Sequence, residues 1–202
     1  MPLSDLTPEQ QKAFQDRLKE LRMDPSKVLK KITPETHKGP VVLSQDPKKS
    51  SVAPHMVTVA SLDEVKRIAG NPDEDYEKGL MAHHHDELPE WPATMNDKDP
   101  SELKPEHNRQ IEAAEHGYLY GHSKRFTSYK AVIEKHKYPA QFAVFAAEDV
   151  CVDSTNSPFQ ITGESAHNYG TFTICEGGSI QFDANAVMTV QKFINSTATK
   201  CK

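Results

Sequence analysis

The stretch GTFTICEGGSIQF, residues 170–182, decides the fold that the sequence predicts. Gly177 and Gly178 favour a tight turn at its centre, because glycine adopts the positive φ angles that hairpin turns need. On either side of this turn, apolar side chains alternate with other residues, which places them on one face of an extended segment. These side chains are Phe172, Ile174, Ile180 and Phe182. The stretch therefore predicts a β-hairpin that buries one face.

The same alternation continues across the C-terminal part of the chain. From residue 128 onward, short runs of β-branched and aromatic residues are separated by Gly, Pro, Asn, Asp and Ser. Examples are QFAVFAA at 141–147, DVCVDS at 149–154 and AVMTVQKFI at 186–194. This pattern predicts antiparallel strands, and we expect a β-sandwich or jelly-roll-like domain over residues 125–202. The repeated succession of strand and turn near the end of the chain makes a short solenoid the minor alternative.

The N-terminal part of the chain predicts helices followed by an extended arm. A Thr-x-x-Gln capping box with proline at the first helical position predicts a helix over residues 8–22. The Asp-Pro pair at 24–25 repeats this signal and predicts a short second helix over 25–32. Residues 33–60 contain four prolines, a density that excludes a helix and favours an extended arm.

Two further helices are expected in the middle of the chain. A capping box at Ser61 predicts a helix over 62–69, and Pro105 predicts the start of another that runs to residue 120. The predicted fold class is therefore α+β, with N-terminal helices and a proline-rich arm before the β-domain. We expect three segments, with boundaries at 1–60, 61–124 and 125–202.

Composition and charge exclude several classes of function. The formal net charge is −5, and residues 138–191 contain no Lys or Arg, so the sequence offers no basic surface for nucleic acid. The N-terminal residues lack the charged and then apolar pattern of a signal peptide, and no stretch approaches the ~18 apolar residues of a membrane span. We therefore expect a cytoplasmic protein without a membrane span and without a nucleic-acid partner.

The three cysteines are Cys151, Cys175 and Cys201, and they show no CxxC or CxxH spacing. An odd number of cysteines without ligand spacing favours reduced thiols in a cytoplasmic protein over a disulfide framework. A disulfide between Cys151 and Cys175, on neighbouring strands, is the alternative.

A histidine tract, HHH at 83–85, provides the one testable site hypothesis. In an extended segment His83 and His85 point to the same side, so both imidazoles can bind one metal ion. A zinc or iron site needs at least one more ligand, which His116 or His122 would supply.

Two carboxylates near these histidines are candidate catalytic groups. Glu87 follows the histidine tract and Glu112 lies on the predicted helix, so either would act as the acid or base beside the metal. The competing interpretation of the tract is a solvated loop that binds no metal in its normal function.

A second motif, GESAH at 163–167, places Ser165 two residues before His167. It lacks the final glycine of a nucleophile elbow and no strand-to-helix turn follows it, so it predicts a polar loop between strands. The sequence contains neither GxGxxG nor the P-loop pattern, which leaves nucleotide chemistry without support.

We therefore expect a non-catalytic β-sandwich interaction or assembly module. Its N-terminal helices and arm would contact a protein partner or a second copy of the chain, giving a homo-oligomer. The low content of hydrophobic residues, 36%, and the absence of a catalytic signature support this interpretation. The alternative is a metal-dependent enzyme in which histidine-bound zinc or iron acts on a small-molecule ligand.

Overall fold

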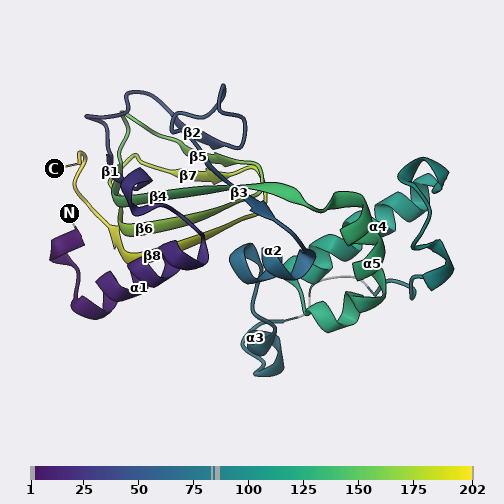
Figure 1. The fold of residues 1–202 in the computed structure, drawn as a ribbon. Helices are drawn as coiled ribbons and strands as arrows, with labels where there is room; N and C mark the ends of the chain where they lie inside the picture. The colour runs from purple at the N-terminus through teal and green to yellow at the C-terminus, as the bar shows by residue number, and fades with distance from the viewer. Residues whose placement is uncertain (1–2, 83, 85–86, 202) are drawn as a thin grey trace. The chain divides into compact units, whose positions relative to one another are not determined.

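The computed structural model describes residues 3–82, 84 and 87–201. The chain divides into two compact units (Figure 1). The strand unit comprises residues 1–57 and 142–202, and the helical unit comprises residues 58–141, which are inserted into it.

The strand unit is built from two parallel sheets. The first has the order β1 (Leu29–Ile32), β4 (Ala140–Val152), β6 (Ser165–Ile174) and β8 (Ala186–Asn195), and β3 (His55–Val59) also pairs with β4. The second has the order β2 (Val41–Ser44), β5 (Phe159–Thr162) and β7 (Ile180–Phe182). Along both orders each strand runs parallel to its neighbours.

From β4 onward, the chain alternates between the two sheets and advances by one strand at each turn. Ala143 in β4 pairs with Ser165 in β6, and Ser165 pairs with Ala186 in β8. In the second sheet, Phe159 in β5 pairs with Ile180 in β7. The strands therefore stack as successive coils, whose inward side chains form one continuous core.

The predicted antiparallel β-sandwich or jelly-roll is wrong. The turn that contains Gly177, with φ of 80°, does not bring β7 back beside β6. It directs the chain into the second sheet, where β7 pairs with β5. The physical reason is that alternation specifies which face of a strand is buried, and the same alternation serves a parallel or an antiparallel neighbour. The arrangement of coils is closer to the solenoid alternative.

The long strands bend at aligned positions. In β4 the inward residues include Ala147 and then Val150, so the inward face changes from odd to even positions. In β6 the corresponding residues are Tyr169 and Phe172. Between them, a Cβ atom on Gly170 would lie 2.5 Å from the carbonyl oxygen of Glu148. Glycine is therefore needed at this close approach of β6 to β4.

A polar ladder lies inside the core of β6. The Oγ of Ser165 is 2.8 Å from Nε2 of His167, whose Nδ1 is 2.9 Å from the hydroxyl of Tyr169. The ring of Phe145 stacks on the imidazole at 5.2 Å. Burial lowers the pKa of His167 to about 3, so the ring stays neutral. The predicted polar loop is confirmed at Gly163 and Glu164, between β5 and β6, and is wrong from Ser165 onward, where the chain forms a buried strand.

Helix α1 (Pro8–Glu20) packs on β6 and β8 (Figure 1). Its predicted capping box at Thr7 is confirmed, and Phe14 and Leu18 are buried. The side-chain amide of Asn168 donates to the Phe14 carbonyl at 3.0 Å, which joins the helix to β6. The apolar side chains of α1 are therefore buried within the strand unit.

The predicted second helix over 25–32 is wrong. Residues Pro25–Lys27 form one 3₁₀ turn, η2, and β1 follows directly. Leu29 pairs with Ala147 and Ile32 pairs with Val150, so sheet formation overrides the local helix signal.

The helical unit contains four α-helices in its described residues. They are α2 (Leu62–Ala69), α3 (Asp73–Glu77), α4 (Pro105–Tyr120) and α5 (Lys130–Lys137). Short 3₁₀ segments are η3 (Ala93–Met95), η4 (Pro100–Glu102) and η5 (Ser123–Tyr129), and η1 (Leu3–Asp5) precedes α1 in the strand unit. The predictions for α2 and α4 are confirmed. The extended run predicted from residue 128 is wrong over α5, where buried Val132 and Ile133 are too few to distinguish the two periods.

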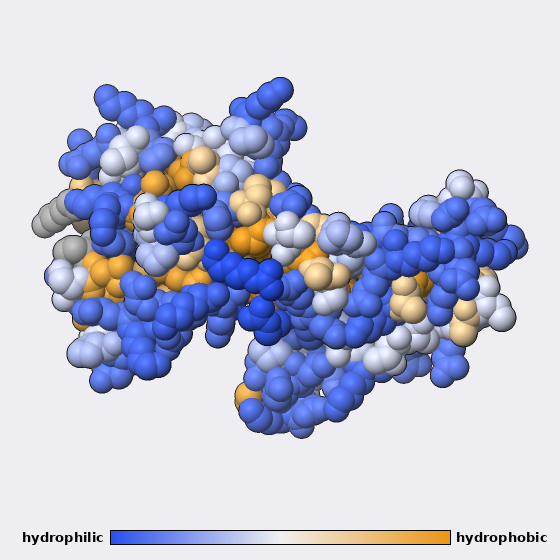
Figure 2. Space-filling view, in the orientation of Figure 1, coloured by the Kyte–Doolittle hydropathy of each residue, from blue (hydrophilic) through white to orange (hydrophobic). Residues whose placement is uncertain are grey.

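The visible surface is mostly hydrophilic, and apolar surface is gathered in patches over the strands of the strand unit (Figure 2). This distribution agrees with the low mean hydropathy of −0.68. In the described part of the chain, no helix combines the length and the apolar character that crossing a membrane requires.

Candidate functional site

The three cysteines converge at one end of the strand unit, although they come from distant parts of the sequence. Cys151 lies near the end of β4, Cys175 follows β6, and Cys201 belongs to the tail after β8. The backbone N–H of Cys175 donates to the Val152 carbonyl at 2.8 Å. The N–H of Glu176 donates to Ala198 at 2.9 Å, so the tail returns along the end of β6.

We call this group the three-cysteine centre: Cys151, Cys175 and Cys201. A disulfide joins Cys151 to Cys201, and Cys175 remains a free thiol. The Sγ of Cys175 lies 3.8 Å from that of Cys151 and 3.9 Å from that of Cys201. Among residues 3–82, 84 and 87–201, this is the one group of three potential metal ligands whose donor atoms all lie within 4.8 Å of one another.

Both predictions for the cysteines are wrong. The chain has one disulfide instead of three reduced thiols, and Cys151 pairs with Cys201 instead of Cys175. The bonded residues are 50 positions apart, so only the return of the tail brings them together. The odd number of cysteines was the available signal, because it leaves one thiol beside any disulfide.

The free thiol lies in a partly polar pocket. Cys175 is 4% exposed and lines a cavity of about 230 Å³ together with Asp149, Thr173 and Ser196. Burial raises the pKa of Cys175, and the negative charge of Asp153 raises it further, against a hydrogen bond with Ser196. The thiol is therefore mostly protonated at neutral pH and becomes a better nucleophile as the pH rises.

A buried carboxylate holds the tail beside the cysteines. Asp153 is 2% exposed and accepts the backbone N–H of Thr155 at 2.7 Å and that of Cys201 at 3.1 Å. Burial alone would raise the pKa of Asp153, but these two hydrogen bonds and the charge of Lys200 lower it below its usual value. The carboxylate is therefore charged at neutral pH and anchors the tail without a covalent bond.

The three-cysteine centre brings together the two reactants of thiol–disulfide exchange, a free thiol and a disulfide. A thiolate attacks a disulfide sulfur and displaces the other sulfur as a new thiolate. The Sγ of Cys175 is nearly equidistant from both sulfurs of the disulfide, so it lies beside the S–S bond. Attack along the S–S axis therefore requires the Cys175 side chain or the tail to shift first, after which either Cys151 or Cys201 can be the leaving group. No other thiol is needed for this reaction.

The histidines and carboxylates predicted as a metal site are dispersed where the structure describes them. His83 and His85 lie outside the described residues. His116 is exposed on α4, with its ring 5.1 Å from that of Tyr120. His122 stacks on Tyr76, with ring centroids 6.1 Å apart.

The two predicted catalytic carboxylates are both exposed. Glu112 lies on the solvent side of α4, and Glu87 is 3.4 Å from the guanidinium of Arg125. Within the described residues, none of His116, His122, Glu87 and Glu112 belongs to a metal-ligand cluster. The zinc or iron site of the histidine tract stays a prediction.

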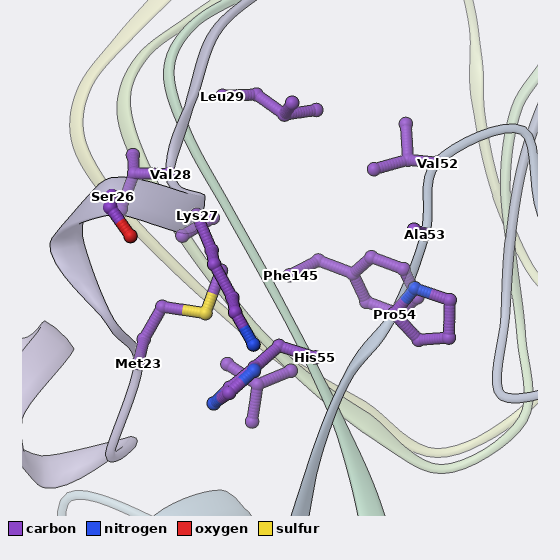
Figure 3. A pocket seen from close by; sticks show the side chains of 12 residues that line it. Met23, Ser26, Lys27, Val28, Leu29, Val52, Ala53, Pro54, His55 and Phe145 are labelled. Carbon is purple, nitrogen blue, oxygen red and sulfur yellow. The ribbon is translucent and has the colours of Figure 1, made fainter.

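A larger pocket lies at the other end of the core of the strand unit (Figure 3). It has a volume of about 430 Å³ and mostly apolar walls, which include Leu29 and Phe145. Lys27 and His55 gather at one end of it (Figure 3), and the ring of His55 is hydrogen-bonded to the Arg22 carbonyl at 3.1 Å. The predicted small-molecule ligand stays a prediction, and this pocket offers it space and two basic side chains, Lys27 and His55.

In the helical unit, a pocket of about 370 Å³ has charged walls, and two of its charged residues, Lys66 and Asp73, pair with each other. The ammonium of Lys66 lies 3.0 Å from Asp73 and donates to the carbonyls of Leu119 and Gly121. Asp73 also accepts the N–H and the hydroxyl of Ser123. These contacts connect α2, α3 and the end of α4, so Lys66 and Asp73 have a structural role.

The three-cysteine centre is therefore the site with the clearest chemistry. In comparisons with protein-family models, curated proteins and solved structures, no match to this chain is found.

Proposed function

We propose that this protein is a redox-responsive module that carries out thiol–disulfide exchange in its three-cysteine centre. The observation that carries the proposal is the position of the Cys175 thiol, 3.8 and 3.9 Å from the two sulfurs of the disulfide. A structural disulfide has no need of a third sulfur at this distance. With the third sulfur nearby, a disulfide can also form between Cys151 and Cys175 or between Cys175 and Cys201.

The exchange conserves electrons and changes which thiol is free. The Cys175 thiolate attacks Sγ of Cys151, the Cys151–Cys201 bond breaks, and Cys201 leaves with the electron pair. The proton lost by Cys175 is returned through solvent to Cys201. Attack on Sγ of Cys201 instead releases Cys151. No external oxidant or reductant is consumed in either direction.

Release of Cys201 changes the attachment of the tail. In the oxidised structure the disulfide and the Asp153 carboxylate both hold residue 201. After exchange, the new Cys151–Cys175 disulfide stays within the strands, while Cys201 becomes a thiol on a half-exposed tail. The protein then presents a thiolate that can attack an external disulfide. Exchange thereby connects a buried disulfide to a partner in solution.

The test follows the position of the free thiol. Protein purified without reductant is incubated without oxygen at mildly alkaline pH, quenched with acid, alkylated after denaturation and mapped by mass spectrometry. We expect the label to move from Cys175 alone to a mixture that includes Cys201 or Cys151. A label that stays on Cys175 at all times would overturn the proposal.

Two variants separate internal exchange from other reactions. Cys175→Ala keeps the Cys151–Cys201 disulfide but removes the attacking thiol, so no new free cysteine should appear. Thr173→Ala changes the wall of the same pocket without changing sulfur chemistry, and it should exchange as the wild type does. Exchange in Cys175→Ala at the wild-type rate would show that an external thiol is responsible.

A second candidate function is self-assembly through β8, which retains the predicted assembly role on a different surface. Phe193 is 55% exposed and stacks on Phe172, with ring centroids 6.1 Å apart. In the described residues, β8 pairs with β6 and with no strand on its other edge. Its one charged residue is Lys192, so the edge lacks most of the charges that usually protect edge strands.

We infer that a second copy of this chain covers the exposed face of the last coil. A two-fold contact between β8 edges would pair equivalent strands and bury both Phe193 side chains. Light scattering should show a dimer that Phe193→Ser weakens, while Met56→Ser, at another exposed apolar residue, has no effect. A wild-type monomer at high concentration would overturn this candidate.

A further inference from the structure

We propose that the three-cysteine centre binds Zn²⁺ through three thiolates when the protein is reduced. The inference rests on the proposed function in that it uses the same three sulfurs. Internal exchange always leaves one disulfide, so an external dithiol or phosphine must supply two electrons to convert Cys151 and Cys201 to thiols before all three sulfurs can act as ligands. The inference adds a ligand and a reduced state that thiol exchange alone does not require.

The positions of the sulfurs agree with zinc geometry. A Zn–S bond of about 2.3 Å and tetrahedral angles place ligand sulfurs about 3.8 Å apart. The Sγ of Cys175 is already 3.8 Å from Cys151 and 3.9 Å from Cys201. Only the third separation must change, and it lengthens when the disulfide is reduced. Cys201 belongs to the tail, so this movement does not disturb the sheets.

The site leaves one coordination position for water. Among the described residues, no histidine or carboxylate shares the 4.8 Å cluster with the three sulfurs. The adjoining cavity of about 230 Å³ has polar walls that include Thr173 and Ser196, and it has room for water. Three protein ligands and one open position would complete tetrahedral coordination.

The charges around the site favour a divalent cation. Three thiolates and Zn²⁺ have a net charge of −1, which the nearby Lys200 can balance because it lines the same cavity. The buried carboxylates of Asp149 and Asp153 add negative potential beside the sulfurs. Thiolate ligands select zinc over magnesium and calcium, which prefer oxygen ligands.

The test titrates Zn²⁺ into protein that a phosphine has reduced and a chelator has freed of metal. Competition with a chromophoric indicator should give one Zn²⁺ per chain for the reduced protein and none at this centre for the oxidised protein. Zn²⁺ should also protect all three cysteines from alkylation. This protection experiment uses the wild-type chain, so it does not depend on a variant that folds.

Variants identify the ligands. Cys175→Ser should weaken Zn²⁺ binding at least tenfold, and Co²⁺ in its place should show weaker thiolate charge-transfer absorption. The double variant His83→Ala, His85→Ala tests the histidine tract as a competing site and should bind with unchanged affinity. Loss of binding in the histidine variant with unprotected cysteines would overturn the inference.

The inference and the proposed function fail in different experiments. Exchange is measured in metal-free, unreduced protein, whereas zinc binding is measured after chemical reduction. Exchange without zinc protection of the cysteines would refute the zinc site alone. Zinc protection without exchange would support the zinc site and refute the proposed function.

Discussion

The backbone N–H of Cys201 donates to the carboxylate of Asp153 at 3.1 Å, while the side chain of the same cysteine is bonded to Cys151. The tail is therefore held by one bond that exchange can break and by one hydrogen bond that exchange leaves intact. Because Asp153 is buried and charged, it keeps the released Cys201 close to the disulfide and favours the return of the bond.

Substitution of Asp153→Ala should shift the exchange equilibrium toward free Cys201. The change leaves two backbone N–H groups without their acceptor, which costs about 1–3 kcal/mol when such groups are buried. The measurement is the fraction of chains with alkylated Cys201 at equilibrium. Glu176→Ala, an exposed carboxylate beside the same centre, is the control and should leave the fraction unchanged. Equal fractions in both variants would contradict the role of Asp153.

The exchange rate should rise with pH. Burial raises the pKa of Cys175 above the ordinary thiol value of 9.0, so the thiolate fraction increases about tenfold per pH unit throughout the neutral and mildly alkaline range. The measurement is the rate at which the alkylation label appears on Cys201 or Cys151, taken at several pH values between about 6.5 and 9. A rate that reaches a plateau below pH 8 would be inconsistent with a buried attacking thiol.

Acid should destabilise the strand unit through His167. Its pKa falls from 6.5 to about 3 on folding, so between these values the unfolded chain binds a proton that the folded chain does not. Stability is therefore complete above pH 6.5 and decreases by about 1.4 kcal/mol per pH unit as the pH falls, a loss of about 2 kcal/mol at pH 5. Urea unfolding at pH 7 and pH 5 measures it.

Two variants assign this acid dependence. His167→Gln should lower the stability at pH 7 because the ladder with Ser165 and Tyr169 is broken, and it should remove the histidine-dependent part of the loss between pH 7 and pH 5. His37→Gln changes a half-buried histidine of the same unit and should retain the loss. The same pH dependence in both variants would assign the effect to other groups.

Gly170→Ala should destabilise the stacked coils. The new methyl group would lie 2.5 Å from the carbonyl oxygen of Glu148, which is backbone and cannot move without distorting β4. Overpacking of this kind costs about 1–3 kcal/mol, which denaturant unfolding resolves. Gln181→Ala, at an exposed position in β7, is the control and should stay near wild-type stability. Unchanged stability of Gly170→Ala would show that the coils can separate at the bend.

Local signals predicted several elements correctly. The capping residues Thr7 and Ser61 mark the starts of α1 and α2, because they satisfy backbone N–H groups within the same turn. The start of α4 was predicted from Pro105, which suits the first helical position. These signals depend on residues three or four positions apart, so they can be recognised without knowledge of the rest of the chain.

The same reasoning failed where distant partners decide the structure. Residues 29–32 form β1 because they pair with β4, more than 100 residues later, and no local pattern encodes that partner. Reasoning from the sequence missed the three-cysteine centre for the same reason. Cys201 was known to be present, but the hydrogen bonds that return the tail to Cys175 appear only in the folded chain.

By itself, the sequence determined where α1, α2 and α4 start and that alternating residues such as Phe172 point toward a core, although Phe182 on the same predicted face is 50% exposed. It also determined that three cysteines cannot all pair within one chain. The tertiary structure alone decided that the strands run parallel in stacked coils, and which cysteine keeps its thiol. The physical reason is range: caps and alternation act over a few residues, whereas strand direction and disulfide choice depend on groups that only the stacking of the coils brings into contact.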